Sequence, residues 1–482
     1  MRVLEQLEPK NVLSFFEDLC AIPHGSGNTK AISDYCVKFA KDRALEVHQD
    51  SLNNVVIVKP ATPGYEAAPT VIVQGHLDMV AEKTPESAIN FLTDGLELEV
   101  DGDFIRARGT TLGGDDGIAV AMALAVLDSD NLAHPRLECL FTVDEETGMD
   151  GAVGFDASIL QGKRLLNIDS EEEGILTVSC AGGAHAAVRI PMTANECALD
   201  AAEIRISGLK GGHSGAEIDK GRANATITLG RVLQALVDEL EIRLVSAEGG
   251  LKDNAIPNAA RAVIALEDGK LARAQELCEK LQATLRMEYA AADPDITVSF
   301  IPGTVASRAL TLRDTKKVCC FLGLYPNGIE SMSMDIPGLV QTSCNLGIFK
   351  VDETGLEGSG SVRSSVASRK ELLLRRIGLL AEGLDGTLCV SGEYPAWEYR
   401  RESHLRDVMC SVYKDQYGTD MKVEAIHAGL ECGLFCGKIP GLDAVSFGPN
   451  LYDIHTTSER MSISSVQRVY AYLCAVLRAL KD

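Results

Sequence analysis

Short apolar runs alternate with amphipathic segments along the chain up to about residue 180. Pro9–Ala21 and Thr29–Arg43 carry apolar residues at helical spacing, and the proline stands at a helix start, where it is tolerated. Short β-branched or leucine-rich runs predict strands at Asn54–Lys59, Pro69–Gln74, Leu137–Val143 and Arg164–Ile168. This alternation predicts an α/β domain with a mostly parallel sheet, whose sites lie beyond the carboxyl ends of the strands. Asp116–Leu127 has almost no polar face, so we expect a helix buried against that sheet.

The pattern changes near Cys180–Gly183, where two sets of strand and helix patterns begin. The first set comprises Glu203–Ser207, Asn224–Leu240, Ala260–Glu267, Leu271–Ala291 and Ile296–Ile301. The second set comprises Arg313–Leu324, Gly338–Lys350, Leu356–Ser364, Ser368–Glu382 and Gly386–Val390. Two packed α+β units of this kind are typical of an inserted domain, and they suggest an old duplication although the sequence shows no repeat.

The α/β pattern returns with a helix at Arg401–Tyr417 and a strand at Leu442–Phe447. We therefore expect a catalytic domain in two parts, residues 1–182 and 393–482, interrupted by an inserted α+β lid domain over residues 183–392. A length of 482 residues agrees with more than one domain.

Charge restricts the range of partners. Lysine and arginine number 46 against 69 acidic residues, which gives a net charge of −23 that is spread along the chain. Such a balance argues against nucleic acid and anionic membranes as partners, because phosphate binding needs clustered basic residues. No apolar stretch approaches the ~18 residues that a membrane span requires.

The cysteines bear on the compartment. The 14 cysteines are scattered without the spacing of a disulfide framework, and the first residues do not resemble a signal peptide. We therefore expect a cytoplasmic protein whose cysteines are mostly small core residues.

The most informative motif is Gln74-Gly75-His76-Leu77-Asp78-Met79, directly after the apolar run Thr70–Val73. His76 and Asp78 stand two residues apart at the end of a predicted strand, so both side chains leave on one face. Acids occupy comparable places in three other segments, at Asp144–Glu146, at Asp169 and at Asp115–Asp116 before the apolar helix.

Taken singly, each of these residues has an ordinary structural interpretation. His76 would be a buried structural histidine, Asp115 a helix N-cap, and Glu145–Glu146 solvated charge. Together, carboxylates and imidazoles that converge at strand ends would lose solvation and repel one another unless a cation held them. The combination therefore predicts a divalent-metal site in a hydrolase.

Five motifs, in chain order and spread over essentially the whole chain, resemble those of the co-catalytic zinc peptidases. They are Gly75–Asp78, Leu112–Gly117, Asp144–Gly148, Asn167–Glu171 and Ile454–Thr456. Within that superfamily the chain is most similar to the bacterial aminoacyl-histidine (Xaa-His, carnosinase-like) dipeptidases.

The resemblance implies a set of metal ligands and a fold detail. His76 and Asp169 would hold one metal ion, Glu146 and His455 a second, and Asp115 would bridge them. Two Zn²⁺ ions are expected, and Mn²⁺ or Co²⁺ suit the same ligands. The resemblance also implies a cis peptide bond between Asp115 and Asp116.

The resemblance also implies roles around the metals. Asp78 would accept the second imidazole N–H of His76. Glu145 would be the general base that takes a proton from a metal-bridging water and later delivers it to the leaving amine.

Residues of the inserted domain would act on the substrate. His213 in Gly211–Gly215 would stabilise the oxyanion, and a glycine-rich turn with an exposed histidine is the alternative. Asn254 would donate to the C-terminal end of the substrate. Arg363 would clamp the free carboxylate, unless it lies on a solvated strand edge.

His427 and Glu431 stand four residues apart and are candidates for the substrate pocket or for its support. We assign Glu431 to substrate binding and leave both interpretations open for His427.

The resemblance predicts an enzyme that hydrolyses dipeptides with a free C-terminus, preferably Xaa-His, by a metal-bridging hydroxide. It further implies a homodimer through the lid. A broader dipeptidase, an aminoacylase or a carboxypeptidase on the same scaffold is the alternative. An inactive binding relative is disfavoured because Glu145 is retained, and nucleotide binding fails because Gly109–Gly117 contains no Lys-Ser/Thr pair.

Overall fold

The computed structural model describes residues 2–481, which form two compact units. The first unit consists of the chain up to Ser179, Tyr399–Ala425 and the chain from Leu430 onward. The second unit consists of Cys180–Glu398 and the short segment Ile426–Gly429. Compared with the predicted boundaries, residues 180–182, 393–398 and Ile426–Gly429 lie in the second unit.

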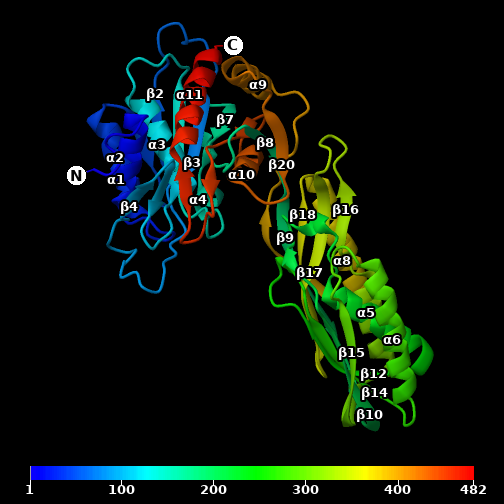
Figure 1. The fold of residues 1–482 in the computed structure, drawn as a ribbon. Helices are drawn as coiled ribbons and strands as arrows, with labels where there is room; N and C mark the ends of the chain where they lie inside the picture. The colour runs from blue at the N-terminus through cyan, green and yellow to red at the C-terminus, as the bar shows by residue number, and fades with distance from the viewer. Residues whose placement is uncertain (1, 482) are drawn as a thin grey trace. The chain divides into compact units, whose positions relative to one another are not determined.

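An eight-stranded mixed sheet forms the centre of the first unit, in the order β1-β2-β6-β3-β7-β21-β8-β20 (Figure 1). Its strands are β1 (Glu46–Gln49), β2 (Val55–Lys59), β3 (Val71–His76), β6 (Leu137–Thr142), β7 (Arg164–Asn167), β8 (Ile175–Cys180), β20 (Lys422–Ile426) and β21 (Asp443–Ser446). The predicted α/β class is confirmed. The four central strands β6, β3, β7 and β21 pair in parallel, whereas β1 pairs antiparallel with β2, β2 with β6, and β8 with β21.

The helices of the first unit are α1 (Lys10–Cys20), α2 (Lys30–Asp42), α3 (Gly114–Asp128), α4 (Asp150–Gly154), the 3-10 helix η1 (Ala157–Ile159), α9 (His404–Tyr417), α10 (Glu431–Lys438) and α11 (Ile463–Ala479). A small second sheet contains β4 (Leu98–Asp101), β5 (Phe104–Ala107), β22 (Leu451–Tyr452) and β23 (Arg460–Ser462). Helix α3 is buried along almost its whole length, as its apolar sequence predicted, and packs against α1 and β3.

The second unit is built on one nine-stranded sheet, in which β15-β10-β14-β12-β17-β18-β9-β19 follow one another and β16 pairs with β17. Its strands are β9 (Gly182–Pro191), β10 (Ala194–Ser207), β12 (Arg243–Gly249), β14 (Ala260–Leu266), β15 (Thr297–Leu310), β16 (Gly328–Met332), β17 (Val340–Val351), β18 (Gly355–Ser364) and β19 (Thr387–Tyr394). Its helices are η2 (Ile218–Lys220), α5 (Ala225–Leu240), α6 (Leu271–Glu288), α7 (Leu312–Leu324) and α8 (Ala367–Gly383).

Two copies of one topology make up this sheet. The elements β10-α5-β12-β14-α6-β15 form one βαββαβ unit, and β9, α7, β17, β18, α8 and β19 form the other. In each, the strands lie in the order fourth, first, third, second, and the two second strands, β12 and β17, pair antiparallel. The two predicted sets are therefore present, but the first set lies in the chain between β9 and α7 of the second, and both share one continuous sheet.

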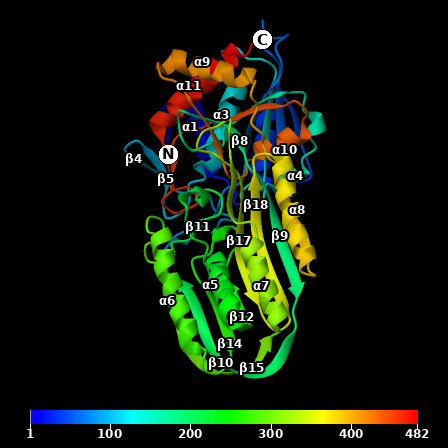
Figure 2. The ribbon, with the colours of Figure 1, turned by 90° about the vertical axis from the view of Figure 1, so that its right-hand side faces the viewer.

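Helices α5, α6, α7 and α8 lie on the same face of the sheet (Figures 1 and 2). A continuous apolar core fills the space between them and the strands, with Leu229, Phe321 and Ile377 from the helices against Ile204 and Ile264 from the strands. Within residues 2–481, none of the helices combines the length and the apolar character needed to cross a bilayer.

Candidate metal centre

The candidate ligands come from the ends of three neighbouring parallel strands, from the first turn of α3 and from one loop. His76 is the last residue of β3, Asp169 follows β7, and Glu146 follows β6. These strands lie in the order β6-β3-β7, so their carboxyl ends meet at one edge of the sheet. Asp115 lies in the first turn of α3, and His455 lies in the loop between β22 and β23.

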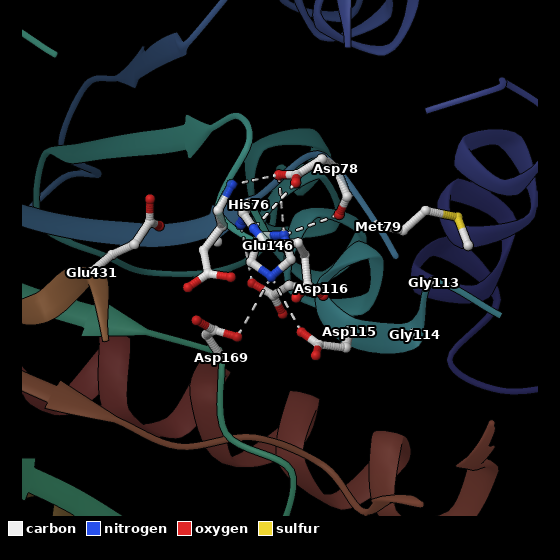
Figure 3. A network of polar contacts seen from close by, with 12 residues as sticks. His76, Asp78, Met79, Gly113, Gly114, Asp115, Asp116, Glu146, Asp169 and Glu431 are labelled. Carbon is white, nitrogen blue, oxygen red and sulfur yellow. Dashed lines mark hydrogen bonds and ion pairs between the residues drawn. The ribbon is translucent and has the colours of Figure 1, made fainter. Parts of the chain in front are cut away.

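All five predicted ligands meet at this edge. The two carboxylate oxygens of Asp115 lie 3.2 Å from Nε2 of His76 and 3.2 Å from Nε2 of His455. His76 is also 3.7 Å from Asp169, and His455 is 2.9 Å from Glu146. Figure 3 shows Asp115 and Asp169 pointing toward the imidazole of His76. Asp115 thus lies between two pairs of side chains, each consisting of one imidazole and one carboxylate.

The donor set fits divalent cations. Oxygen and nitrogen atoms of His76, Asp116 and Asp169 lie within 4.8 Å of one another, and so do those of Asp115, Glu146 and His455. Imidazoles with carboxylates are the ligands of zinc and of similar ions in hydrolases. The predicted cis peptide bond between Asp115 and Asp116 is confirmed.

Opposite charges compensate one another in this cluster. Burial alone would lower the pKa of His76, but the carboxylates of Asp115, Asp78 and Asp169 outweigh it and raise that pKa well above its usual value. Asp115 and Glu146 raise the pKa of His455 to about 10. Burial raises the pKa of Asp169 well above its usual value. A divalent cation could balance the same carboxylates in place of protons.

Asp78 fixes both His76 and the segment that carries the two glutamates. Nδ1 of His76 lies 3.0 Å from the backbone oxygen of Asp78 and 3.5 Å from its carboxylate. The carboxylate accepts hydrogen bonds from the backbone N–H groups of Glu145 (3.1 Å) and Glu146 (3.4 Å). Of the two Asp78 acceptors, the backbone carbonyl therefore lies nearer to Nδ1 of His76 than the carboxylate, which is the acceptor that we expected.

Glu145 lies close to the predicted ligands, because its carboxylate is within 4.8 Å of His76 and Glu146. Burial, together with the neighbouring carboxylates of Glu146 and Asp115, raises the pKa of Glu145 to about 7 although His76 opposes the shift. A carboxyl with a pKa near the working pH is suited to accept and release a proton.

Glu431 is a buried carboxyl close to the metal centre. It is the first residue of α10 and has no exposed surface, and its Oε2 accepts hydrogen bonds from Gln74 (2.6 Å) and Thr142 (2.7 Å). Burial, with Glu145 nearby, raises the pKa of Glu431 to about 8. Gln74 and Thr142 lie on β3 and β6, so Glu431 supports the strands that carry His76 and Glu146. This placement differs from the direct substrate contact that we predicted.

Asp116 was not selected from the sequence. Its buried carboxylate accepts the backbone N–H of His76 at 3.1 Å. An added Cβ at Gly75 would lie 2.5 Å from that carboxylate, so this position has no room for a side chain. Asp116 contacts a backbone N–H group, which no residue type marks in the sequence. Its position next to Asp115 is therefore the one sequence signal for this role.

The second unit brings three basic side chains together, His213, Arg363 and His427, which we name the basic cluster. Gly215 lies between them, since a Cβ added there would come within 3.0 Å of the His213 ring, 3.1 Å of Nε of Arg363 and 2.7 Å of the His427 carbonyl oxygen. Arg363 donates to the hydroxyl of Tyr394 at 2.9 Å, and its buried Nε has no acceptor within residues 2–481.

His213 and Asn254 lie on adjacent backbone segments. His213 ends β11 (Gly212–His213), which pairs with β13 (Ala255–Ile256), and the N–H of Ser214 donates to the Asn254 carbonyl at 2.9 Å. Nδ1 of His213 accepts the N–H groups of Gly215 (3.2 Å) and Ala216 (3.0 Å). The neutral imidazole therefore carries its proton on Nε2.

Known proteins similar to this chain support the resemblance. The model of peptidase family M20/M25/M40 matches residues 72–479. The cytosol non-specific dipeptidase of Escherichia coli (strain K12) is 34% identical over 100% of this chain and 99% of its own length.

Solved structures show the same fold. The crystal structure of aminoacylhistidine dipeptidase from Vibrio alginolyticus has a TM-score of 0.95 and 35% identity, over 99% of this chain and 98% of that one. The aminopeptidase PepT from Bacillus cereus, at 16% identity and a TM-score of 0.56 over 99% of this chain and 100% of its own, shares the fold alone.

Proposed function

Because the chain belongs to peptidase family M20/M25/M40, we propose that it is a metal-dependent dipeptidase. Its substrates are dipeptides with a free C-terminus, preferably Xaa-His. The observation that carries this proposal is the convergence of His76, Asp169, Glu146 and His455 around the carboxylate of Asp115.

Two divalent ions fit this proposal. His76 and Asp169 would hold one ion, Glu146 and His455 the other, and Asp115 would hold both. When bound, such ions supply positive charge for the carbonyl oxygen and lower the pKa of water. Zinc is the first choice, and manganese or cobalt suits the same ligands.

Proton transfer falls to Glu145. In its ionised form it accepts the proton of the attacking water, and in its protonated form it delivers that proton to the leaving amine. Its pKa of about 7 makes both forms accessible near neutral pH. Asp78 holds the backbone of Glu145 and so orients the base.

The basic cluster is suited to bind the rest of the dipeptide. The unpartnered Nε–H of Arg363 can pair with the free carboxylate of the substrate. The Nε2–H of His213 can donate to the developing oxyanion. Asn254, on the segment next to His213, would donate to the C-terminal end of the substrate. These roles require the second unit to act as a lid over the metal centre.

A broader dipeptidase is the second candidate function. The Escherichia coli relative is named a non-specific dipeptidase, whereas the Vibrio alginolyticus relative is named for aminoacylhistidine substrates. Arg363 favours any substrate with a free carboxylate and does not select the side chain beside it.

We also propose a cytosolic homodimer, and a solution mass of one chain would contradict the dimer.

The substrate class is tested with glycyl-histidine, β-alanyl-histidine and glycyl-histidinamide. We expect both dipeptides to be hydrolysed and kcat/KM for the amide to fall roughly 10- to 100-fold, because a charge-assisted hydrogen bond is lost. Arg363→Ala should remove this difference. Arg189→Ala should preserve it, since that exposed guanidinium lies on β9 of the same sheet.

Two results would favour the alternatives. Faster hydrolysis of N-acetyl-histidine than of glycyl-histidine would indicate an aminoacylase. Release of the last residue from longer peptides at the dipeptide rate would indicate a carboxypeptidase.

A further inference from the structure

A second buried glutamate contacts the loop that presents Asp115. Glu459 is 3% exposed, and its Oε2 accepts the backbone N–H groups of Leu112 (2.7 Å) and Gly113 (3.1 Å). Its Oε1 accepts those of Gly114 (2.9 Å) and Asp115 (3.4 Å). One carboxylate therefore binds four consecutive backbone donors, including that of Asp115 itself.

The loop geometry depends on this close approach. Gly113 has a positive φ of 65°, which favours glycine, and a Cβ added at Gly114 would lie 3.3 Å from Oε1 of Glu459. The four N–H groups belong to the start of α3, where the helix dipole favours a negative charge. Both oxygens of the side chain act as acceptors, and a glutamine amide supplies only one oxygen.

Glu459 is also part of the turn that presents His455. Its backbone N–H donates to the carbonyl of Thr456 at 3.1 Å, and the Thr456 hydroxyl donates to the carbonyl of Asp453 at 2.7 Å. The turn is closed by an ion pair between Arg460 and Asp453. The segment that carries His455 is thus attached through one carboxylate to the segment that carries Asp115.

We propose that Glu459 is a positioning residue that fixes the separation between Asp115 and His455. It touches neither substrate nor the reacting atoms and acts through the backbone of residues 112–115. The inference rests on the proposed metal centre. It predicts that losing the carboxylate weakens the ion held by Glu146, His455 and Asp115 more than the ion held by His76 and Asp169.

Glu138 provides a matched control in the same unit. It is 1% exposed, lies near the start of β6, and accepts the backbone N–H groups of Gln161 and Gly162 at 3.0 Å. It therefore holds a loop as Glu459 does, but at the opposite end of β6 from Glu146. If Glu459 only stabilised the fold, the two glutamine variants would behave alike.

The test compares Glu459→Gln and Glu138→Gln with the wild-type protein. Co²⁺ is titrated into metal-free protein against a chromophoric chelator, its visible absorption spectrum is recorded, and melting of the metal-free proteins is followed. We expect both variants to melt at lower temperature. Only Glu459→Gln should bind one Co²⁺ about 10- to 100-fold more weakly and change the cobalt spectrum.

Wild-type cobalt affinities and spectrum in Glu459→Gln, with lowered melting, would overturn the positioning role and leave the proposed function intact. Wild-type protein that binds no Co²⁺ would contradict the proposed function and this inference together. If Glu459→Gln does not fold, Glu459→Asp replaces it. Its shorter carboxylate should give an intermediate affinity for the same ion, and unchanged affinities would again overturn the inference.

Discussion

At the scale of single residues, two neighbouring acids of the metal centre, Glu145 and Glu146, are assigned different roles. Glu146 lies 2.9 Å from His455, and the carboxylates of both Glu145 and Glu146 lie within 4.8 Å of His76. Glu145, the next residue, has its backbone fixed by Asp78 and a pKa raised to about 7, mainly by burial. We therefore assign metal binding to Glu146 and proton transfer to Glu145.

This division predicts different defects for Glu145→Gln and Glu146→Gln. Glu145→Gln should keep two bound ions per chain but lose about 10²- to 10⁴-fold in kcat, the usual contribution of a general base. Glu146→Gln should lose one ion. Metal content and steady-state kinetics measured on the same preparations check both outcomes, and an active Glu145→Gln variant would remove the proposed role.

The convergence of His76, Glu146 and Asp169 could be predicted because their motifs follow apolar strands, whereas the assignment of His455 as a ligand depended on the family resemblance. The roles of Asp116 and Glu459 could not be predicted from the sequence. Their partners are backbone N–H groups, which every residue except proline has, so no residue type marks the contact. Glu459 is also 347 positions from Leu112, so only the folded chain brings them together.

At the scale of elements, the basic cluster depends on how Ile426–Gly429 docks on the sheet of the second unit. His427 is buried in this segment, and its Nε2 lies 2.7 Å from the hydroxyl of Ser343 on β17. Ser343 is the cross-strand partner of Arg363 on β18. The docked segment therefore packs His427 beside the guanidinium that we propose binds the substrate carboxylate.

Docking of this segment should weaken in acid. Burial and the charge of Arg363 lower the pKa of His427 to about 4, whereas an unfolded histidine has a value near 6.5. Between these values the unfolded chain binds more protons, so stability falls as the pH drops from 6.5 to 4. Relative to neutral pH, this preference of the proton for the unfolded chain lowers the free energy of unfolding at pH 5 by about 2 kcal/mol.

Trp397 can report this loss, because it is the single tryptophan and is buried in the second unit. Urea unfolding followed by its fluorescence should show a smaller loss of stability between pH 7 and pH 5 in His427→Asn than in the wild type. His404→Gln, at an exposed histidine of α9, should behave as the wild type. Equal losses in all three proteins would rule out the assignment.

All the helices and strands that we predicted are present, with ends shifted by a few residues or, for β10 and β15, extended. Apolar periodicity marked them because buried faces repeat along a helix or a strand. Strands without such a run were not predicted. The Gly-Gly-Ala start of β9 and the mixed sequence of β12 are examples. Helix α11 (Ile463–Ala479) was also not predicted, although Val466, Val469, Leu473 and Val476 recur at helical spacing.

At the scale of the whole molecule, each unit has its own sheet, and the second unit is an insertion in the chain of the first. The α/β class of the first unit follows from alternating strands and helices. The single sheet of the second unit does not follow from local patterns. It depends on pairing between β12 and β17, such as Ala247 with Val351, which local sequence does not encode.

Metal-dependent hydrolysis is tested most directly by following glycyl-histidine cleavage while metal is removed and returned. The purified protein is assayed as isolated, after chelation, and during stepwise addition of Zn²⁺ or Mn²⁺, with bound metal counted per chain. We predict that activity disappears with the metal and returns as occupancy approaches two ions per chain. Full activity in metal-free protein, or two bound ions without hydrolysis of any dipeptide, would contradict the proposed metal-dependent dipeptidase.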